Sequence, residues 1–148
     1  MQPPRLLPPH YFVFSLLTMI GLRIIETAPL FGGSWYLLGL LPLVPGLGIA
    51  LWGVRLFAKV GTNIVPFTES TALVTDGAFA YSRNPMYLGM VLVLLGVALL
   101  LDRASPWLVL VPFILVIRLK FIQFEEPLME QTFGEDYVTY KSNVRRWL

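Results

Sequence analysis

Two short polar segments, far apart in the sequence, carry the residues best suited to chemistry. The first is Arg83-Asn84-Pro85, and the second is the carboxylate pair Glu125-Glu126. An arginine at a helix start favours anion binding, because the free N–H groups and the dipole of the first turn also attract negative charge. A carboxylate pair suits positive groups and hydroxyl groups. If the fold brings the segments together, they predict a site for a zwitterion with a further positive centre.

The segment around Arg83 has the pattern of a loop that ends in a helix. Asp76-Gly77 predicts a turn, since glycine tolerates a positive φ and aspartate can bond its own backbone. Asn84 is a suitable N-cap, and Pro85 at the first helical position loses no hydrogen bond. Helix caps are common, so an ordinary capped helix remains the simpler interpretation of Asn84-Pro85 taken alone.

The other polar groups also have simple interpretations. Glu125-Glu126 alone could be a solvated helix start in which the dipole favours acids. Most of the aromatic residues near the two segments fit a belt at the membrane interface, although one or two could stack on a purine or face a cation. These aromatic residues are Phe79, Tyr81, Tyr87, Phe133, Tyr137 and Tyr140.

Composition places the chain in a bilayer. Its 148 residues are 56% hydrophobic and 14% charged, with a mean hydropathy of +0.70. Soluble domains carry about 25% charged residues. The absence of cysteine excludes disulfides and thiolate chemistry, and His10 is the one histidine, so no metal site is predicted. A net charge of +2 gives no reason to expect a nucleic-acid partner.

Four apolar runs predict an all-α membrane protein with about four transmembrane helices in one domain, residues 1–148. The predicted spans lie near 7–26, 35–58, 85–101 and 106–124, with a polar loop at 60–84 and a tail at 125–148 that holds short helices. Prolines and glycines in the second span predict a kink or close packing against a neighbour. Arg23 and Glu26, three residues apart near the end of the first span, are expected either to pair or to extend toward the membrane interface.

Basic residues predict the orientation. In a four-span arrangement most of them fall on one side, and the positive-inside rule makes that side cytoplasmic. They are Arg5, Arg55, Lys59, Arg83, Arg118, Lys120, Lys141, Arg145 and Arg146. Both termini, the loop and the tail are then cytoplasmic, so Arg83 and Glu125-Glu126 share one face of a multi-pass membrane protein.

No familiar hydrolase, nucleotide-binding or zinc-protease motif occurs in the sequence. A reaction that needs little acid–base help fits best, and methyl transfer from a sulfonium is one, because positioning supplies most of its rate.

Ordered motifs over roughly residues 55–146 resemble the isoprenylcysteine carboxyl methyltransferase family and the related phospholipid N-methyltransferases. The motifs are Leu73-Val74-Thr75-x-Gly77, Arg83-Asn84-Pro85-x-Tyr87-x-Gly89, Glu125-Glu126 and Phe133-Gly134-Glu135-x-Tyr137-x-x-Tyr140. Members of these families are integral membrane enzymes that use S-adenosylmethionine. The resemblance therefore implies this cofactor, with S-adenosylhomocysteine as its product.

The resemblance also implies the site residues. The implied cofactor-binding residues are Thr71, Ala72, Leu73, Val74, Phe79, Arg83, Asn84, Pro85, Met86, Tyr87 and Glu125. The implied catalytic residues are Arg83, Glu125 and Glu126. Asn84 stands where the carboxyl methyltransferases usually have histidine, and Phe79 where they often have tyrosine.

The implied methyl acceptor is lipidic or amphiphilic, and a prenylcysteine-like carboxylate is the one most resembled. It would reach a cytoplasmic site sideways between helices, with the kinked second span lining the entrance. Two alternatives stay open: N-methylation of a phospholipid amine, and a non-catalytic assembly or transport subunit with the same fold.

Overall fold

A computed structural model describes residues 6–62 and 70–148, and every regular element in these ranges is a helix. Arg5 and residues 63–69 of the predicted loop lie outside the described residues. The α-helices are α1 (Pro8–Ile25), α2 (Leu40–Val60), α3 (Pro85–Leu101), α4 (Trp107–Ile117), α5 (Gln123–Phe133) and α6 (Glu135–Asn143). Two 3₁₀ turns, η1 (Trp35–Gly39) and η2 (Gly77–Ala80), and a π turn, η3 (Arg118–Ile122), complete the set. The all-α prediction is confirmed.

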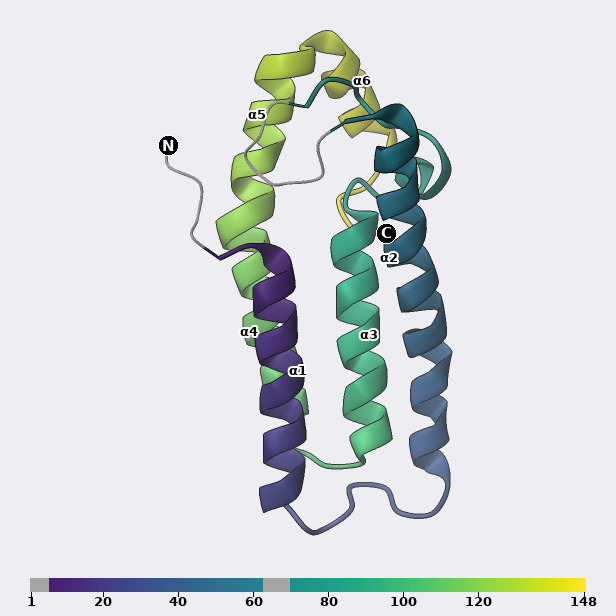
Figure 1. The fold of residues 1–148 in the computed structure, drawn as a ribbon, viewed down its shortest axis with the longest axis vertical. Helices are drawn as coiled ribbons and strands as arrows, with labels where there is room; N and C mark the ends of the chain where they lie inside the picture. The colour runs from purple at the N-terminus through teal and green to yellow at the C-terminus, as the bar shows by residue number, and fades with distance from the viewer. Residues whose placement is uncertain (1–5, 63–69) are drawn as a thin grey trace.

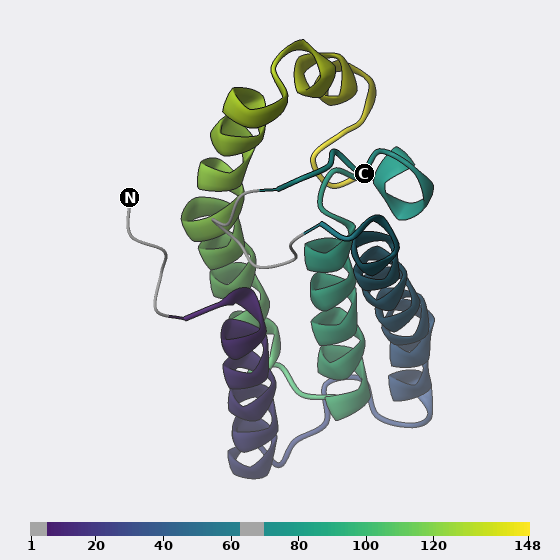
Figure 2. The ribbon, with the colours of Figure 1, turned by 45° about the horizontal axis from the view of Figure 1, so that its top comes forward.

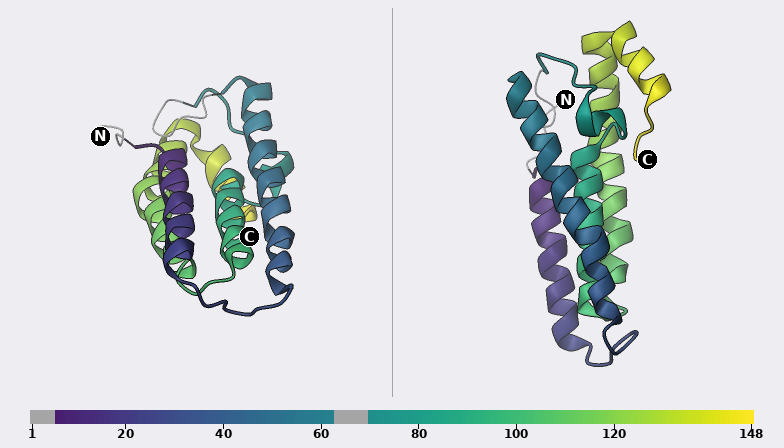
Figure 3. Two further views of the ribbon diagram at one scale, coloured as in Figure 1. Left: turned by 60° about the horizontal axis from the view of Figure 1, so that its bottom comes forward. Right: turned by 90° about the vertical axis from the view of Figure 1, so that its right-hand side faces the viewer.

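The first four α-helices form an antiparallel bundle in which successive helices run in opposite directions (Figure 1). Helix α3 is central, since it contacts α1, α2 and α4. Residues 70–84, which precede α3, and the segment that follows α5 lie at one end of the bundle, here called the tail end (Figure 3). The predicted meeting of Arg83 with the tail depends on this topology.

Three stretches of helix are long and apolar enough to cross a membrane: Pro8–Ile25, Trp35–Val60 and Trp107–Phe133. Helix α3 is apolar but shorter, at 17 residues. These lengths support a multi-pass membrane protein, since a span needs about 20 residues. Which end of the bundle faces the cytoplasm stays a prediction.

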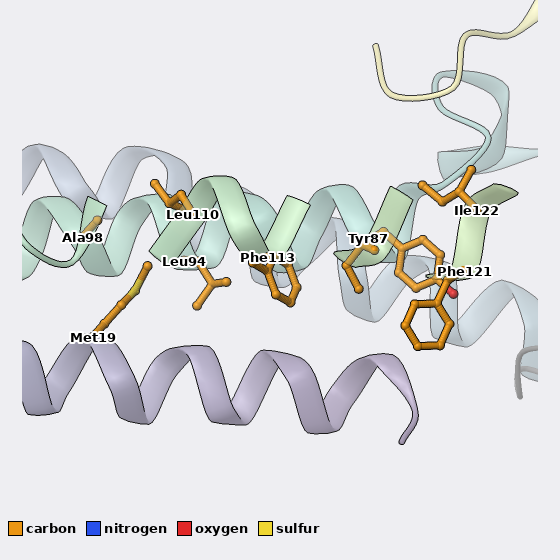
Figure 4. Close-up of a cluster of buried hydrophobic side chains, with 9 residues drawn as sticks. Met19, Tyr87, Leu94, Ala98, Leu110, Phe113, Phe121 and Ile122 are labelled. Atoms are coloured by element: carbon orange, nitrogen blue, oxygen red, sulfur yellow. The ribbon is translucent and has the colours of Figure 1, made fainter. Parts of the chain in front are cut away.

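The bundle core lies where α1 and α4 pack on α3 (Figure 4). Met19, Leu94 and Ile117 are fully buried there, and Phe113 is nearly so. The aromatic ring of Tyr87 belongs to the same cluster, 6.4 Å from that of Phe121. The core therefore extends up to the first turn of α3 and fixes the helix that begins at the predicted site.

Helices α2 and α3 approach closely through facing glycines, as predicted for the second span. A Cβ atom built on Gly89 would lie 2.6 Å from the carbonyl oxygen of Gly46 and 2.7 Å from Cβ of Ala50. A Cβ on Gly96 would lie 2.6 Å from the carbonyl oxygen of Gly39. Such backbone contact leaves no room for side chains, and small residues are what permit it between membrane helices.

The helix of the predicted fourth span continues beyond residue 124. Helix α4 continues through η3 into α5, so the helical stretch extends to Phe133, where Gly134 stops it with a φ of +51°. A π turn holds one more residue than an α turn. The neighbours Phe121 and Ile122, both within this turn, are fully buried. The π turn also sets the register of Glu125 and Glu126 that follow.

Of the two possibilities for Arg23 and Glu26, pairing is not observed between them. Glu26 instead accepts hydrogen bonds from the backbone N–H groups of Ala104 and Ser105, at 3.3 and 2.8 Å. Arg103 Nε donates to the Glu26 carbonyl oxygen at 2.8 Å. Carboxylates accept strongly from the N–H groups of a turn. These bonds tie the end of α1 to the α3–α4 turn, opposite the tail end.

Candidate functional site

A tight turn brings the chain to the start of α3. Gly77 has a φ of +59°, and a Cβ atom there would lie 2.9 Å from Cδ1 of Leu56 and 3.1 Å from the Trp52 ring. Only glycine satisfies both the positive φ and the close contact with α2. The predicted turn at Asp76-Gly77 is therefore confirmed, and it leads through η2 to Arg83.

Arg83 and Glu126 meet in a buried ion pair that also includes Arg146. Nη2 of Arg83 lies 3.2 Å from Oε1 of Glu126, and both side chains are only 9% exposed. Arg146 binds the same carboxylate with two bonds, from Nε at 2.9 Å and from Nη2 at 2.6 Å. Two guanidinium groups thus share one carboxylate, and the cluster has a net charge of +1.

This pairing leaves two hydrogen-bond donors of Arg83 without a partner among the described residues. Its Nε and Nη1 atoms are buried and have no hydrogen-bond partner within the described part of the chain. A buried donor left unbonded costs about 1–3 kcal/mol, and more when it is charged. The cluster therefore favours an added anion at Arg83.

Glu125 points away from this cluster. Its Oε1 accepts the hydroxyl of Tyr87 at 2.8 Å, which links α5 to the first turn of α3. Glu125 and Glu126 follow each other in the sequence but have different partners, since adjacent helical residues point about 100° apart. The structure brings the three predicted catalytic residues to the tail end, where Arg83 and Glu126 share one ion pair and Glu125 has a different partner.

The last residues of the chain return to the start of α3 (Figure 2). We call residues 144–148 the C-terminal strap. The N–H of Arg83 donates to the Arg145 carbonyl oxygen at 2.9 Å, and Nδ2 of Asn84 donates to that of Arg146 at 3.0 Å. Asn84 occupies the N-cap position, with Pro85 first in the helix, but its side chain makes no cap hydrogen bond. The predicted side-chain cap is wrong, because the strap takes the amide group.

A second cluster lies beneath the loop. Val74 and Phe79 pack there with Tyr137 and Tyr140 of α6, and all four are buried. The predicted interfacial belt is wrong for Phe79, Tyr137 and Tyr140, and for Tyr87 in the bundle core, whereas Tyr81 is 72% exposed. Phe79 lies against Phe57, with ring centroids 5.2 Å apart, so in this conformation it supports the loop.

Both phenols of α6 stay protonated near neutral pH. Burial, together with the negative charge of Glu126, raises the pKa of Tyr137 to about 12, while the Arg83 charge opposes the rise. Burial also raises the pKa of Tyr140. Tyr140 uses its hydroxyl to donate to the Phe79 carbonyl oxygen at 2.7 Å, which joins α6 to η2.

We expect Tyr140→Phe to lower the free energy of unfolding by about 1–2 kcal/mol, because it leaves the buried Phe79 carbonyl without its donor. The measurement is thermal unfolding in detergent micelles followed by circular dichroism. Tyr81→Phe is the matched control, since it removes an exposed hydroxyl. Equal midpoints for the two variants would show that the Tyr140 bond adds nothing to stability.

The other predicted residues surround these clusters. Thr71 is exposed, with its N–H bonded to Oγ1 of Thr62, while Ala72 and Leu73 are half-buried. Met86 and Pro85 lie against Gly53 of α2. The sequence reasoning missed Arg146, which it used only for topology. The available signal was a pair of adjacent arginines, Arg145 and Arg146, in the same predicted tail as the two glutamates.

A sequence profile of phospholipid methyltransferases matches residues 34–136, which contain Arg83 and both glutamates. The chain belongs to this family. The phospholipid methyltransferase match covers α2 to α5 and ends before the C-terminal strap. A protein of Haemophilus influenzae described as uncharacterized is 46% identical over 63 residues, which are 43% of this chain and all of that protein. No solved structure matches the chain significantly.

The family suggests a membrane methyltransferase. This agrees with the membrane methyltransferase that the sequence motifs predict. The long apolar helices are consistent with it.

Proposed function

We propose that this phospholipid methyltransferase family member transfers a methyl group from S-adenosylmethionine to a lipidic acceptor at the tail end of the bundle. The observation that carries the proposal is the buried guanidinium of Arg83, with two unpartnered donors, at the start of α3. An anion there would receive charge-assisted hydrogen bonds and the favourable dipole of the helix.

The residues at this end fit the chemical groups of the cofactor. Arg83 offers two donors to the carboxylate of its amino-acid part. Glu125 uses one oxygen for Tyr87, and its carboxylate has further acceptor capacity for an ammonium or ribose hydroxyl group. When bound, the cofactor supplies a methyl group activated by a sulfonium. The protein needs mainly to hold and orient both reactants.

The remaining predicted residues differ in exposure, and we assign their roles accordingly. Thr71 is exposed, Ala72 and Leu73 are partly exposed, and the three form the proposed edge of the cofactor site. Val74, Phe79, Pro85, Met86 and Tyr87 are wholly or partly buried and support the loop and the start of α3. Glu126 has both oxygens bonded to arginines, so we assign it a positioning role.

Two acceptor classes differ in their proton balance. Methylation of a phospholipid amine releases one proton, for which the Glu125 carboxylate is a candidate acceptor. Methylation of a prenylcysteine-like carboxylate releases none. The matched family is described by phospholipids, which favours the amine, whereas the motifs most resemble the carboxyl methyltransferases. An acceptor assay must therefore contain both.

We expect the purified protein in micelles to bind S-adenosylhomocysteine in isothermal titration calorimetry. With isotope-labelled S-adenosylmethionine, mass spectrometry is expected to find the label in either phosphatidylethanolamine or a prenylcysteine analogue. Glu125→Gln should preserve folding and lower the rate, and the loss should be larger for an amine acceptor. A folded sample that neither binds the product nor labels a lipid would overturn the proposal and favour a non-catalytic subunit.

A further inference from the structure

The C-terminal strap places a second arginine against the carboxylate that also binds Arg83. Arg146 takes Oε2 of Glu126 alone, at 2.6 Å, and shares Oε1 with Arg83. Its side chain is 33% exposed, whereas those of Arg83 and Glu126 are 9% exposed. Arg146 therefore covers the solvent side of Glu126, and Arg83 binds from the buried side.

This sharing decides how much positive charge remains on the inner side of the cluster. A carboxylate bonded to a single arginine normally receives two parallel hydrogen bonds and neutralises it. Here Arg146 makes the two-bond contact, and Arg83 keeps only an ion-pair contact from Nη2 to Oε1, at 3.2 Å. Nε and Nη1 of Arg83 are left as buried donors, free of partners among residues 6–62 and 70–148.

We infer that Arg146 is a positioning residue which, by holding Glu126, leaves the positive charge and the two free donors of Arg83 available for the carboxylate of a bound cofactor. The inference rests on the proposed function and deepens it. Without Arg146, Glu126 is free to turn both oxygens toward Arg83, and the net charge of the cluster falls from +1 to 0. Arg146 acts on the ligand through Glu126 and Arg83 and does not touch it.

The strap backbone reinforces this arrangement. The N–H of Arg83 and the amide of Asn84 bind consecutive strap carbonyl oxygens, at 2.9 and 3.0 Å. The hydroxyl of Ser82 is 3.4 Å from the Arg146 carbonyl oxygen. These bonds place the Arg146 side chain beside Glu126. A strap that served only to hold the loop would need these backbone bonds but not the charge of Arg146.

The test is a double-mutant cycle read by calorimetry with S-adenosylhomocysteine on full-length protein in micelles. We expect Arg146→Gln to weaken binding about tenfold, the effect of one charge-assisted hydrogen bond. Arg146→Gln combined with Glu126→Gln restores the net charge of +1, so it should bind within about threefold of the parent protein. Arg55→Gln, which removes an exposed charge from α2, should leave binding unchanged.

The outcomes separate the claims. A purely structural strap predicts that the double variant binds no better than Arg146→Gln, and that result would overturn the inference, as would full binding by Arg146→Gln. If the parent protein itself binds no product, the proposed function fails and the inference fails with it. If Arg146→Gln does not fold, Arg146→Lys replaces it, because lysine keeps the charge. Arg146→Lys should bind the product within about threefold of the parent protein. A tenfold loss of affinity would contradict the inference that the charge of Arg146 matters.

Discussion

Replacing Arg83 by methionine is expected to weaken the binding of S-adenosylhomocysteine about a hundredfold, because two charge-assisted hydrogen bonds are lost together. Methionine retains an apolar stem of similar length, so packing against the tail should change little. The substitution also removes the net positive charge of the cluster, since Glu126 then pairs with Arg146 alone. Methyl transfer should fall at least as far as binding.

Arg83→Met should raise the free energy of unfolding slightly or leave it almost unchanged. Arg83 is buried, and its Nε and Nη1 have no partners among the residues that the structure describes. Replacing a buried ion pair member with an apolar residue is most costly when it leaves a lone charge. Here Arg146 stays bonded to Glu126, so no lone charge remains. A variant that unfolds easily would contradict this description of the cluster.

Two further variants sharpen the result. Arg55→Met removes a basic side chain that is exposed on α2, and it should bind S-adenosylhomocysteine like the parent protein. Arg83→Lys keeps the charge but loses the planar set of donors, so its affinity should fall between the parent and Arg83→Met. If Arg83→Met binds normally in calorimetry, the anion is held elsewhere and the proposed site is wrong.

The sequence predicted the elements of this fold closely because apolar runs in a membrane protein are long and uninterrupted. The start of α3 at Pro85 and the turn at Gly77 followed from backbone rules for proline and glycine. The placement of Arg83 and Glu126 at the same end of the bundle followed from topology alone. Two spans lie between them in the sequence, and an even number of spans returns the chain to the side from which it started. Periodicity could not predict the π turn, which shifts the register within an otherwise regular helix.

Side-chain partners were less predictable than positions. Asn84 has the residue type of a cap, but the competing strap carbonyl lies sixty-two residues later in the chain. A pair with the nearby Arg23 was one possibility for Glu26, which instead binds the turn between α3 and α4. In each case a local rule named an adequate partner, and a distant segment supplied another. Arg146 was missed because its role exists only once the chain folds back.

Adding a methyl group at Gly89 is expected to have the largest effect on the stability of the fold. In Gly89→Ala the new Cβ atom would lie 2.6–2.8 Å from atoms of Gly46 and Ala50, two of which belong to the backbone. Backbone atoms cannot turn aside as a flexible side chain can, so α2 and α3 must separate. We expect a loss of about 3 kcal/mol in the free energy of unfolding, the upper end for an overpacked core.

Gly48→Ala is the control with the opposite sign. Gly48 lies on the exposed side of α2, and a Cβ atom there would have nothing within 4 Å. Alanine in a helix interior is favoured over glycine by about 1 kcal/mol, so this variant should be as stable as the parent protein or more stable. Both measurements use thermal unfolding in the same detergent. Equal destabilisation of the two variants would contradict close packing of α2 on α3.

The same contact links packing to the site. Near the start of α3, a Cβ atom on Gly53 would lie 2.7 Å from Cγ of Met86, so α2 presses against the residue that follows Pro85. Gly77 is held against Leu56 and Trp52 of the same helix. Separating α2 from α3 must therefore move the loop that carries Arg83. Gly89→Ala should weaken S-adenosylhomocysteine binding even at temperatures where the protein stays folded, whereas Gly48→Ala should not.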